Sequence, residues 1–166
     1  MTSGMMLPAE LSGLLNALGF NWPESDEGKL FELGGLWTGF SERLGPAAAE
    51  ADAQAMQVLN ANTGAAIEKF KAFWTDGEAP KQNLDDGATA SSLVGAGLYV
   101  CAGVVIALKV VVVAQLVMLA VQIAQAIATA VPTFGLSLLE IPIFKEIVSL
   151  LIDQAINFAV SQVLSA

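Results

Sequence analysis

Apolar residues recur at helical spacing near the start of the chain. Five leucines follow the three- and four-residue steps of one helix face: Leu7, Leu11, Leu14, Leu15 and Leu18. Pro8 is compatible with a first helical turn, and Gly19 suits a C-terminal cap. The pattern predicts a short amphipathic helix that ends in a corner at Trp22 and Pro23, because proline disfavours helix at the residue before it.

A second helix is predicted to start just after this corner. Asn21 or Ser25 is positioned to cap it, because short polar side chains accept hydrogen bonds from the free N–H groups of a first turn. Asp26 and Glu27 then fall in the first turn, where the helix dipole favours negative charge. Two adjacent acids without further ligands do not match a calcium-binding loop. We therefore interpret these acids as a helix start and not as a metal site.

This second helix is predicted to pack on a partner helix along an apolar seam. The seam advances by three and four residues and consists of Leu30, Leu33, Trp37, Phe40 and Leu44. Trp37 is thereby predicted to be a core residue. Gly45 and Pro46 are positioned to kink an alanine-rich continuation of the helix, which ends in the turn residues of "NANTG" at Gly64.

A return helix is predicted after this turn, with Thr63 as its cap. It carries three large apolar side chains on one face: Ile67, Phe70 and Trp74. The two helices form a helical hairpin with a tight turn near Asn62. The segment "TDGEAPKQNLDDG" then predicts a break between Trp74 and Asp86, because glycine, proline and charge interrupt the pattern.

The remainder of the chain is dominated by apolar residues. Between Asp86 and Glu140 the only charged residue is Lys109, and neither glycine nor proline interrupts residues 104–131. A strand of that length is implausible. Residues 91–131 are therefore predicted to form one helix, which at 1.5 Å per residue would be about 60 Å long.

This long helix is either a membrane span or a helix buried in a protein core or an oligomer. The uncharged stretches on both sides of Lys109 are long enough to cross a bilayer. A lysine at the bilayer centre costs roughly 2.5–3.5 kcal/mol, however, and no aromatic belt or basic cluster marks a membrane boundary. Gln115, Gln122 and Gln125 form a polar stripe on the side opposite Lys109. We favour burial, and assign Lys109 and the three glutamines to the assembly or membrane face.

A corner is predicted at Pro132, Gly135 and Pro142, after which a last helix returns. Its apolar residues lie on most of its circumference: Ile147, Leu150, Leu151, Ile156, Phe158, Val160 and Leu164. Such a helix needs cover on more than one side. The predicted fold class is therefore all-α, with a long helical hairpin followed by long apolar helices in an elongated bundle.

Charge is distributed unevenly along the chain. The net charge is −9, from 16 acidic and 7 basic side chains. Of these, 13 acids and 5 bases lie in residues 1–86, which leaves three acids and two lysines in residues 87–166. We predict one helical domain, 1–166, with an acidic hairpin part and an apolar part divided at that point. Attraction to nucleic acid or to anionic lipid is disfavoured.

The composition also excludes most enzyme classes. Histidine is absent and Cys101 is the only cysteine, which removes the usual acid–base residue, His/Cys zinc sites and intrachain disulfides. Apolar neighbours predict that Cys101 is an inert core residue. We expect no catalytic residue, cofactor or metal. The first residues show no cleaved secretory signal, which leaves the cytoplasm or a route that needs none.

Several segments, in this order and spacing, resemble a known family. They are the stretch from Leu7 to Phe40 that contains "GFNWPESDE", the segment "NANTGAAIEKFKAFW", a long apolar helix with an isolated lysine, and "VPTFG". Together they resemble the amino-terminal WXG100-like domain of actinobacterial polymorphic toxins, which include the channel-forming protein that carries the tuberculosis necrotizing toxin. The resemblance implies a helical leader of type VII secretion. The packing residues of its hairpin would be Trp22, Leu30, Leu33, Trp37, Phe40, Gly64, Phe70 and Trp74.

Within that resemblance, Trp22 and Pro23 are expected to set the angle at which the first helix folds onto the hairpin. The literal tripeptide at Trp37 looks like the Trp-X-Gly of small type VII secreted proteins, but it is predicted inside a helix and not in the turn. Tyr99 is followed four residues later by Gly103, so the usual Tyr-x-x-x-Asp/Glu export signal is lacking. The catalytic domain of the toxins does not follow, which would leave the trafficking or scaffold part.

Three functions fit these observations. The leading hypothesis is a non-enzymatic interaction or scaffold protein that forms a homo-oligomer, or pairs with a helical protein partner, through its apolar C-terminal half. The first alternative is a membrane-inserting or pore-forming element made from residues 91–166. The second is a structural subunit or cargo of a larger assembly. The protein is expected to be secreted without a cleaved signal or associated with the cell envelope, with the cytoplasm as the alternative.

Overall fold

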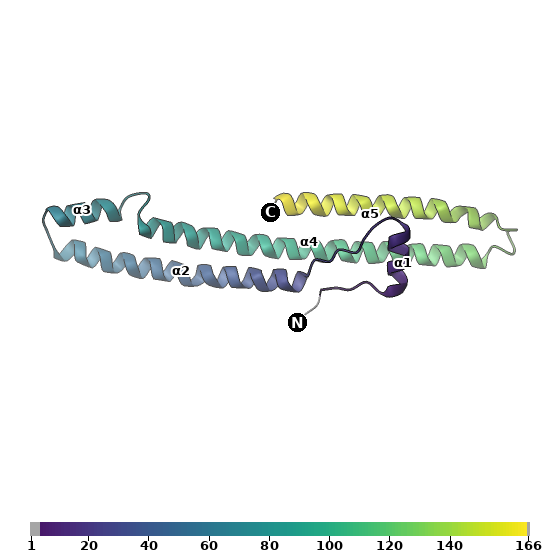
Figure 1. The fold of residues 1–166 in the computed structure, drawn as a ribbon, viewed down its shortest axis with the longest axis horizontal. Coiled ribbons are helices and arrows are strands. Elements are labelled where there is room, and N and C mark those ends of the chain that lie inside the picture. Colours follow the sequence, from purple (N-terminus) through teal and green to yellow (C-terminus); the bar gives the residue numbers. More distant parts are fainter. Residues whose placement is uncertain (1–3, 166) are drawn as a thin grey trace. The chain divides into compact units, whose positions relative to one another are not determined.

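The structure, a computed structural model, describes residues 4–165. Its elements in chain order are α1 (Ala9–Ala17), α2 (Glu27–Ala61), α3 (Ala65–Trp74), α4 (Pro80–Ala128), the 3-10 helix η1 (Leu136–Leu139) and α5 (Glu140–Ser165) (Figure 1). No strand occurs among the described residues. The predicted all-α fold class is confirmed, and residues 91–128 of the long apolar helix are helical as predicted.

The chain divides into two compact units. One unit combines the N-terminal residues up to Leu30 with the chain from Val100 to its C-terminal end, and the other is Phe31–Tyr99. Helices α2 and α4 each contribute residues to both units. The change from acidic to apolar composition at residue 86 lies inside α4, so it does not coincide with a boundary between the units.

α1 ends in a Schellman motif, as its sequence predicts. Gly19 has a φ of +86°, the left-handed region that favours glycine. The Gly19 N–H donates to the carbonyl of Asn16 at 3.0 Å. The Phe20 N–H donates to the carbonyl of Leu15 at 3.2 Å. The predicted helix and its glycine cap are therefore confirmed.

The N-cap of α2 is Asp26. Its carboxylate accepts a hydrogen bond from the N–H of Lys29 at 3.1 Å. The prediction of Asn21 or Ser25 as the cap is therefore wrong, because the helix begins one or more residues later than either would require. Glu27 lies in the first turn as predicted.

The turn of the hairpin lies at residues 62–64, where it was predicted. Gly64 has a φ of +119°, which a glycine adopts readily. The Asn62 amide donates back to the carbonyl of Val58 at 2.9 Å. Gly64 itself is the N-cap of α3 and no side chain caps this helix, so the prediction of Thr63 as the cap is wrong.

α4 begins earlier than the sequence predicts. The break after α3 covers only residues 75–79, because Pro80 occupies the first helical position, where its missing N–H costs no hydrogen bond. Asp76 forms a tight turn there, in which its carboxylate accepts a bond from the N–H of Glu78 at 2.9 Å. Residues 81–86, predicted as part of the break, are helical. Likewise, α5 begins at Glu140 and includes Pro142, which was predicted to lie in the corner.

Within Phe31–Tyr99, α2 and the first part of α4 run antiparallel and approach closely through small residues (Figure 1). A Cβ atom on Gly95 would lie 2.6 Å from Thr38 Oγ1 and 3.0 Å from the carbonyl oxygen of Gly34. The Ser41 hydroxyl donates to the carbonyl of Ala88 at 2.6 Å. Only residues with small side chains permit so short a separation between two helices.

The buried face of α2 is not the predicted seam. Its buried residues are Gly34, Ala48 and Ala55. By contrast, the side chains of the predicted seam are exposed by 45%, 41% and 45% at Leu33, Trp37 and Phe40. The core position predicted for Trp37 is therefore wrong, because α2 approaches α4 through its small residues and turns its large ones outward.

The core of the other unit lies between α1, α4 and α5, and Figure 1 shows α1 crossing α4. Leu15 of α1 packs there with five residues of the two long helices: Val112, Leu116, Leu119, Val148 and Ile152. The flanking side chains of Phe20 and Trp22 pack against the same cluster. The expectation that α1 folds onto the hairpin is therefore wrong, because its leucines find their apolar partners on α4 and α5.

Candidate functional site

The isolated lysine of the apolar helix is buried. Lys109 is 1% exposed, and its Nζ donates to the carbonyl of Ser25 at 2.7 Å and to the carboxylate of Glu27 at 2.9 Å. The same atom lies 5.6 Å from the centre of the Trp22 ring, within the range of a cation–π interaction. The assignment of Lys109 to an assembly or membrane face is therefore wrong, because its charge is satisfied inside the chain.

The N-terminal segment completes this arrangement. The Glu27 carboxylate also accepts a hydrogen bond from the N–H of Met5, and the Trp22 indole donates to the Met5 carbonyl at 3.1 Å. The bond from Lys109, followed by that from Met5, lowers the pKa of Glu27 to about 2. Among the residues that the structure describes, no buried side-chain nitrogen or oxygen lacks a partner. We call Met5, Trp22, Ser25, Glu27 and Lys109 the lysine clasp; its polar groups bind one another, so its role is structural.

The exposed side of α4 is the most unusual surface of the molecule. Over residues 100–128, all of which the structure describes, Gln125 carries the only exposed polar side chain. The large exposed side chains there are 39–60% accessible: Val100, Val110, Val111, Val117, Met118, Val121 and Ile127. Gln115 and Gln122 are half-buried at the edge of this surface. We call the exposed residues of 100–128 the α4 face.

Cys101 lies next to this face and is a free thiol. Its side chain is half-buried, so the prediction of a core residue is only partly right. The neighbouring residue Ala102 is fully buried, so at this turn of α4 the core contact is made by Ala102 and not by Cys101.

α5 extends the apolar surface beside the α4 face. Only Val148, Ile152 and Ala159 of α5 are buried. An apolar groove of about 160 Å³ runs between the two helices, lined by Val104, Ala107, Leu108, Val111, Ala155, Phe158 and Ala159. Phe158 and Ile147, on this side of α5, are 66% and 51% exposed. The exposed Gln154 lies on the same side, four residues before Phe158, and Glu146, Asp153 and Asn157 are also exposed on the helix.

Both long helices are apolar enough to cross a membrane by length and composition. Their most apolar 18-residue stretches have mean hydropathies of 2.7 for α4 and 1.6 for the helical stretch Leu136–Ser165. Only 22% and 17% of these stretches are buried within the chain. A core helix of a soluble monomer is mostly buried, so the fold of one chain leaves most of this apolar surface without cover.

The predicted seam residues of α2 gather on the surface of the hairpin. Leu33, Leu36, Trp37 and Phe40 line a shallow pocket of about 330 Å³. The rings of Trp37 and Phe40 meet edge-on, with centroids 6.4 Å apart. Leu30, at the start of the same seam, is half-buried. Trp37 lies well inside α2 and far from the turn at Gly64, as predicted, so the literal Trp-X-Gly tripeptide is not in the hairpin turn.

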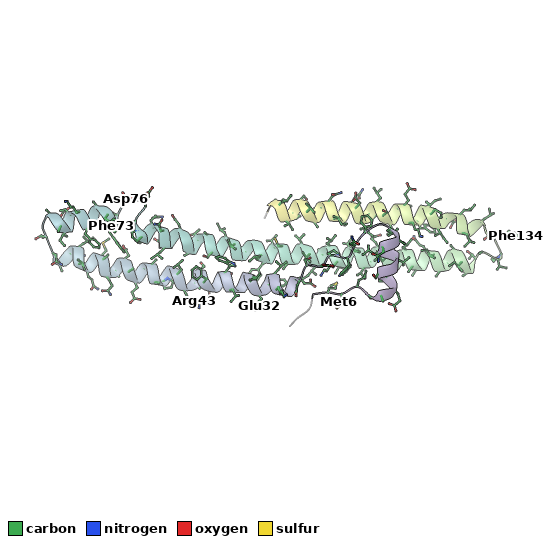
Figure 2. All side chains as sticks on the ribbon, viewed as in Figure 1. Met6, Glu32, Arg43, Phe73, Asp76 and Phe134 are labelled. Carbon is green, nitrogen blue, oxygen red and sulfur yellow. The ribbon has the colours of Figure 1, made fainter. Side chains whose placement is uncertain are left out.

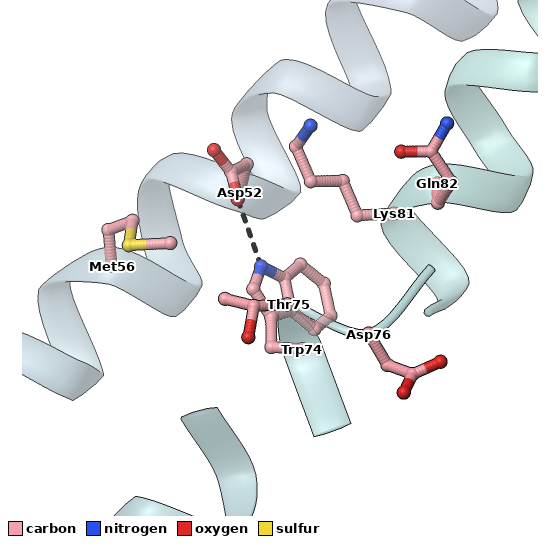
Figure 3. Close-up of a pocket in the computed structure, with 7 residues that line it drawn as sticks. All are labelled: Asp52, Met56, Trp74, Thr75, Asp76, Lys81 and Gln82. Atoms are coloured by element: carbon pink, nitrogen blue, oxygen red, sulfur yellow. Dashed lines mark hydrogen bonds between the residues drawn. The ribbon is translucent and has the colours of Figure 1, made fainter. Parts of the chain in front are cut away.

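Phe70 and Trp74 lie on one face of α3, as their spacing predicts. Their rings are in contact at a centroid distance of 5.9 Å and are tilted by 35°, and the Trp74 indole donates to the Asp52 carboxylate at 2.9 Å (Figure 3). This bond ties α3 to α2 beside an open pocket of about 280 Å³ lined by Asp52, Met56, Trp74, Thr75, Asp76, Lys81 and Gln82. The ammonium of Lys81 pairs with Asp85 at 2.7 Å, which raises the pKa of Lys81.

A comparison with known protein families shows to which family this chain is related. The family description "WXG100 like domain" matches residues 6–143, which contain α1 to α4, the α4 face and all of the lysine clasp except Met5. The chain belongs to the WXG100-like domain family. WXG100-like proteins are helical proteins related to type VII secretion, and they typically form dimers or pair with partners. No curated protein and no solved structure matches the chain.

Sequence reasoning missed two parts of this WXG100-like structure. The first is Glu27 as the partner of Lys109. A lone lysine in an apolar helix indicates that an acidic residue pairs with it. Residues 1–86 contain 13 acidic residues, however, and the sequence does not indicate which of them is the partner. The second is the small-residue face of α2. The sequence feature that could have revealed this face is the pair Gly34 and Thr38, four residues apart on the side of α2 that faces Gly95. A search for hydrophobic periodicity does not detect small residues of this kind.

Proposed function

We propose that this WXG100-like protein is a non-enzymatic association module that pairs with a second copy of itself. The pairing surface is the α4 face together with the adjoining apolar side of α5. The observation that carries the proposal is the exposure of residues 100–128 with Gln125 as their only exposed polar side chain. Contiguous apolar surfaces beyond a few hundred Å² mark association sites in soluble proteins.

Charge does not oppose a second copy at this surface. The chain carries a net charge of −9, and most of its acids lie in residues 1–86. Two identical acidic chains repel each other, but the α4 face carries no charge and brings none of those acids to the contact. Residues 100–128 span about 42 Å at 1.5 Å per residue, and a helix pair of that length reaches the size of a standard interface.

We further infer that the paired form serves type VII secretion, as a leader or scaffold that leaves the cell without a cleaved signal or stays with the cell envelope. The family relation over residues 6–143 supports this role. The composition supports a non-enzymatic one, because the chain has no histidine and a single, half-buried cysteine.

Size-exclusion chromatography with light scattering tests the pairing. Val117 on the α4 face and Val58 on α2 are exposed by 47% and 46%, so they form a matched pair of positions. We expect a discrete oligomer for the wild type in detergent-free buffer and for Val58→Glu. Val117→Glu should run as a monomer, because it places a carboxylate in the centre of the proposed contact.

Other results would contradict the proposal or favour its alternatives. A wild-type monomer at micromolar concentration that binds no hydrophobic dye would contradict it. Recovery only in detergent or in the membrane pellet would favour the membrane-inserting element, for which the low burial of both apolar helices is the supporting observation. Closed particles in electron microscopy would favour a structural subunit of a larger assembly.

A further inference from the structure

One row of exposed residues on α4 follows a strict heptad repeat. Among the side chains that Figure 2 shows along α4, this row advances through residues 100–128 by alternate steps of three and four. Its members are Val100, Gly103, Ala107, Val110, Ala114, Val117, Val121, Ala124 and Ala128. We call this row the outer seam. Such a repeat is typical of a helix that packs along its length on another helix in a coiled coil.

The opposite side of α4 already packs with the same repeat. Its buried residues are also separated by steps of three, four or seven: Ala102, Lys109, Val112, Leu116, Leu119 and Ala126. Val112, Leu116 and Leu119 belong to the core that α4 shares with α1 and α5. The outer seam therefore has the form of a second helix-packing surface, and all of its residues are exposed in the single chain.

The outer seam is complementary to itself in side-chain size. Its valines are 47–51% exposed, and the positions between them carry glycine or alanine. When two copies run antiparallel with their centre at residue 112, every layer joins one valine to one smaller residue. These layers are Val100 with Ala124, Gly103 with Val121, Ala107 with Val117, and Val110 with Ala114. Self-complementarity is what a contact between two copies related by a two-fold axis requires.

Other arrangements of two seams lack this match. A parallel pair in register would place Val110 against Val110 and Gly103 against Gly103. An antiparallel pair shifted by one heptad would place Val110 against Val121. The same shift would leave Ala107 against Ala124. Layers with two valines force the helices apart and layers with two small residues leave gaps, and both are unfavourable in a close-packed interface.

We propose that two copies of the chain pair through the outer seam as an antiparallel coiled coil centred on residue 112. This inference rests on the pairing proposed above, to which it adds the orientation and the register. Layers of one valine and one smaller residue suit a close separation of the two helix axes. Val111 and Met118, which are 39% and 57% exposed, flank the seam and extend the apolar contact. Gln125 lies beside a layer and not within one, so the layers contain no polar side chain.

An exchange of side-chain sizes tests the register. Ala107→Val combined with Val117→Ala exchanges the two members of one layer, so each layer keeps one valine and one smaller residue. Ala114→Val combined with Val117→Ala is the matched control, because it has the same composition but places two valines opposite each other at 110 and 114. In sedimentation equilibrium we expect the first variant to associate within about threefold of the wild type, and the control at least about tenfold more weakly.

The order of these two variants separates the possible arrangements. A parallel pair would weaken both equally, because each variant would then have one layer of two valines and one of two alanines. The shifted antiparallel pair would reverse their order, because residues 114 and 117 would then share a layer. Either result would overturn the proposal. All substituted positions are exposed in the single chain, so circular dichroism should show the wild-type fold for both variants.

Cysteine cross-linking measures the orientation directly. Cys101→Ala removes the native thiol, and single cysteines are then introduced in separate chains as Ala107→Cys, Val117→Cys and Ala124→Cys. A disulfide requires Cα atoms within about 7 Å of each other. We expect oxidation of mixed chains to join Ala107→Cys to Val117→Cys. Neither of these chains should link to a copy of itself, and Ala107→Cys should not link to Ala124→Cys.

The remaining outcomes distinguish this proposal from the pairing on which it rests. Self-linking of Ala107→Cys would indicate a parallel pair, and its linking to Ala124→Cys would indicate a shifted register. Both would overturn the antiparallel arrangement, whereas pairing on the α4 face would stand. An associated protein without any of these cross-links would also overturn it. A wild type that does not associate in detergent-free buffer would overturn the arrangement and the pairing together.

Discussion

The ammonium of Lys109 lies 2.9 Å from the carboxylate of Glu27, a residue 82 positions earlier in the sequence. The two side chains differ in their access to water, with 2% of Lys109 and 12% of Glu27 exposed. Glu27 also holds a second donor, the N–H of Met5. Lys109 is the more buried of the two, and its other partners, the Ser25 carbonyl and the Trp22 ring, carry no formal charge, so loss of either partner has unequal consequences.

Glu27→Gln is expected to destabilise the protein more than Lys109→Met. The glutamine leaves a buried ammonium without a counter-ion, for which the cost is about 3–5 kcal/mol. Methionine keeps most of the volume of the lysine and removes the buried charge, so we expect a loss of about 1 kcal/mol. The free energy of unfolding in urea measures both.

The double variant isolates the interaction itself. Glu27→Gln combined with Lys109→Met should be nearly as stable as Lys109→Met alone, which corresponds to a coupling of about 3–5 kcal/mol, the full cost of Glu27→Gln. Glu50→Gln, at an exposed position of α2, is the surface control. If Glu27→Gln costs no more than Glu50→Gln, the clasp does not stabilise the fold.

Acid should remove the contribution of the clasp. The pKa of Glu27 is about 2 in the folded chain, below the value of about 4.3 for an unfolded glutamate. The unfolded state therefore binds the proton first, so the contribution is complete above about pH 5 and is lost as the pH falls from 4.3 towards 2. Urea midpoints at pH 6, 4 and 3 should show the gap between wild type and Glu27→Gln narrowing. A constant gap would contradict the assignment.

Gly95→Ala should destabilise the hairpin. The new Cβ atom would lie 2.6 Å from Thr38 Oγ1 and 3.0 Å from the carbonyl of Gly34, so α2 and α4 would have to separate. We expect a loss of about 1–3 kcal/mol. Gly39→Ala is the control, because nothing lies within 4 Å of its Cβ position and alanine favours helix. Thermal unfolding should place the two variants on opposite sides of the wild type; equal shifts would argue against the close contact.

Leu15→Ala should loosen α1. Leu15 is 2% exposed and packs against α4 and α5, so its truncation should cost about 2–5 kcal/mol. Limited proteolysis with mass spectrometry should detect faster cleavage in residues 18–26, which connect α1 to α2. Leu36→Ala, at a position 60% exposed, should leave the cleavage rate unchanged. Equal protection of all three proteins would show that α1 does not depend on this contact.

The sequence predicted those features whose cause is local. Gly19 and Gly64 mark helix ends because left-handed backbone favours glycine wherever it occurs. The apolar run without proline predicted most of α4, since length alone excludes a strand. The start of α4 was not predicted because Pro80 was interpreted as a residue that interrupts a helix. Proline is also common at the first position of a helix.

Features that depend on distant partners were not predicted. The spacing of Leu33, Trp37 and Phe40 indicates that one side of α2 is apolar, but it does not say whether that side meets another helix of the same chain. The close approach at Gly34 and Gly95 depends on small size and not on hydrophobicity. In the same way, Lys109 is buried and paired with Glu27 only because the fold brings the N-terminal segment next to α4.

The two units differ in how much of the chain must be present before each can fold. Phe31–Tyr99 is continuous in sequence, whereas the other unit needs both ends of the chain. The continuous unit can therefore fold during synthesis, before α5 has been made. Its completion brings the rings of Phe31 and Tyr99 to a centroid distance of 5.9 Å. Glu27 lies four residues from Phe31 and Lys109 ten residues from Tyr99, so with these rings already together the Glu27–Lys109 pair closes a far shorter loop than its 82 positions in sequence.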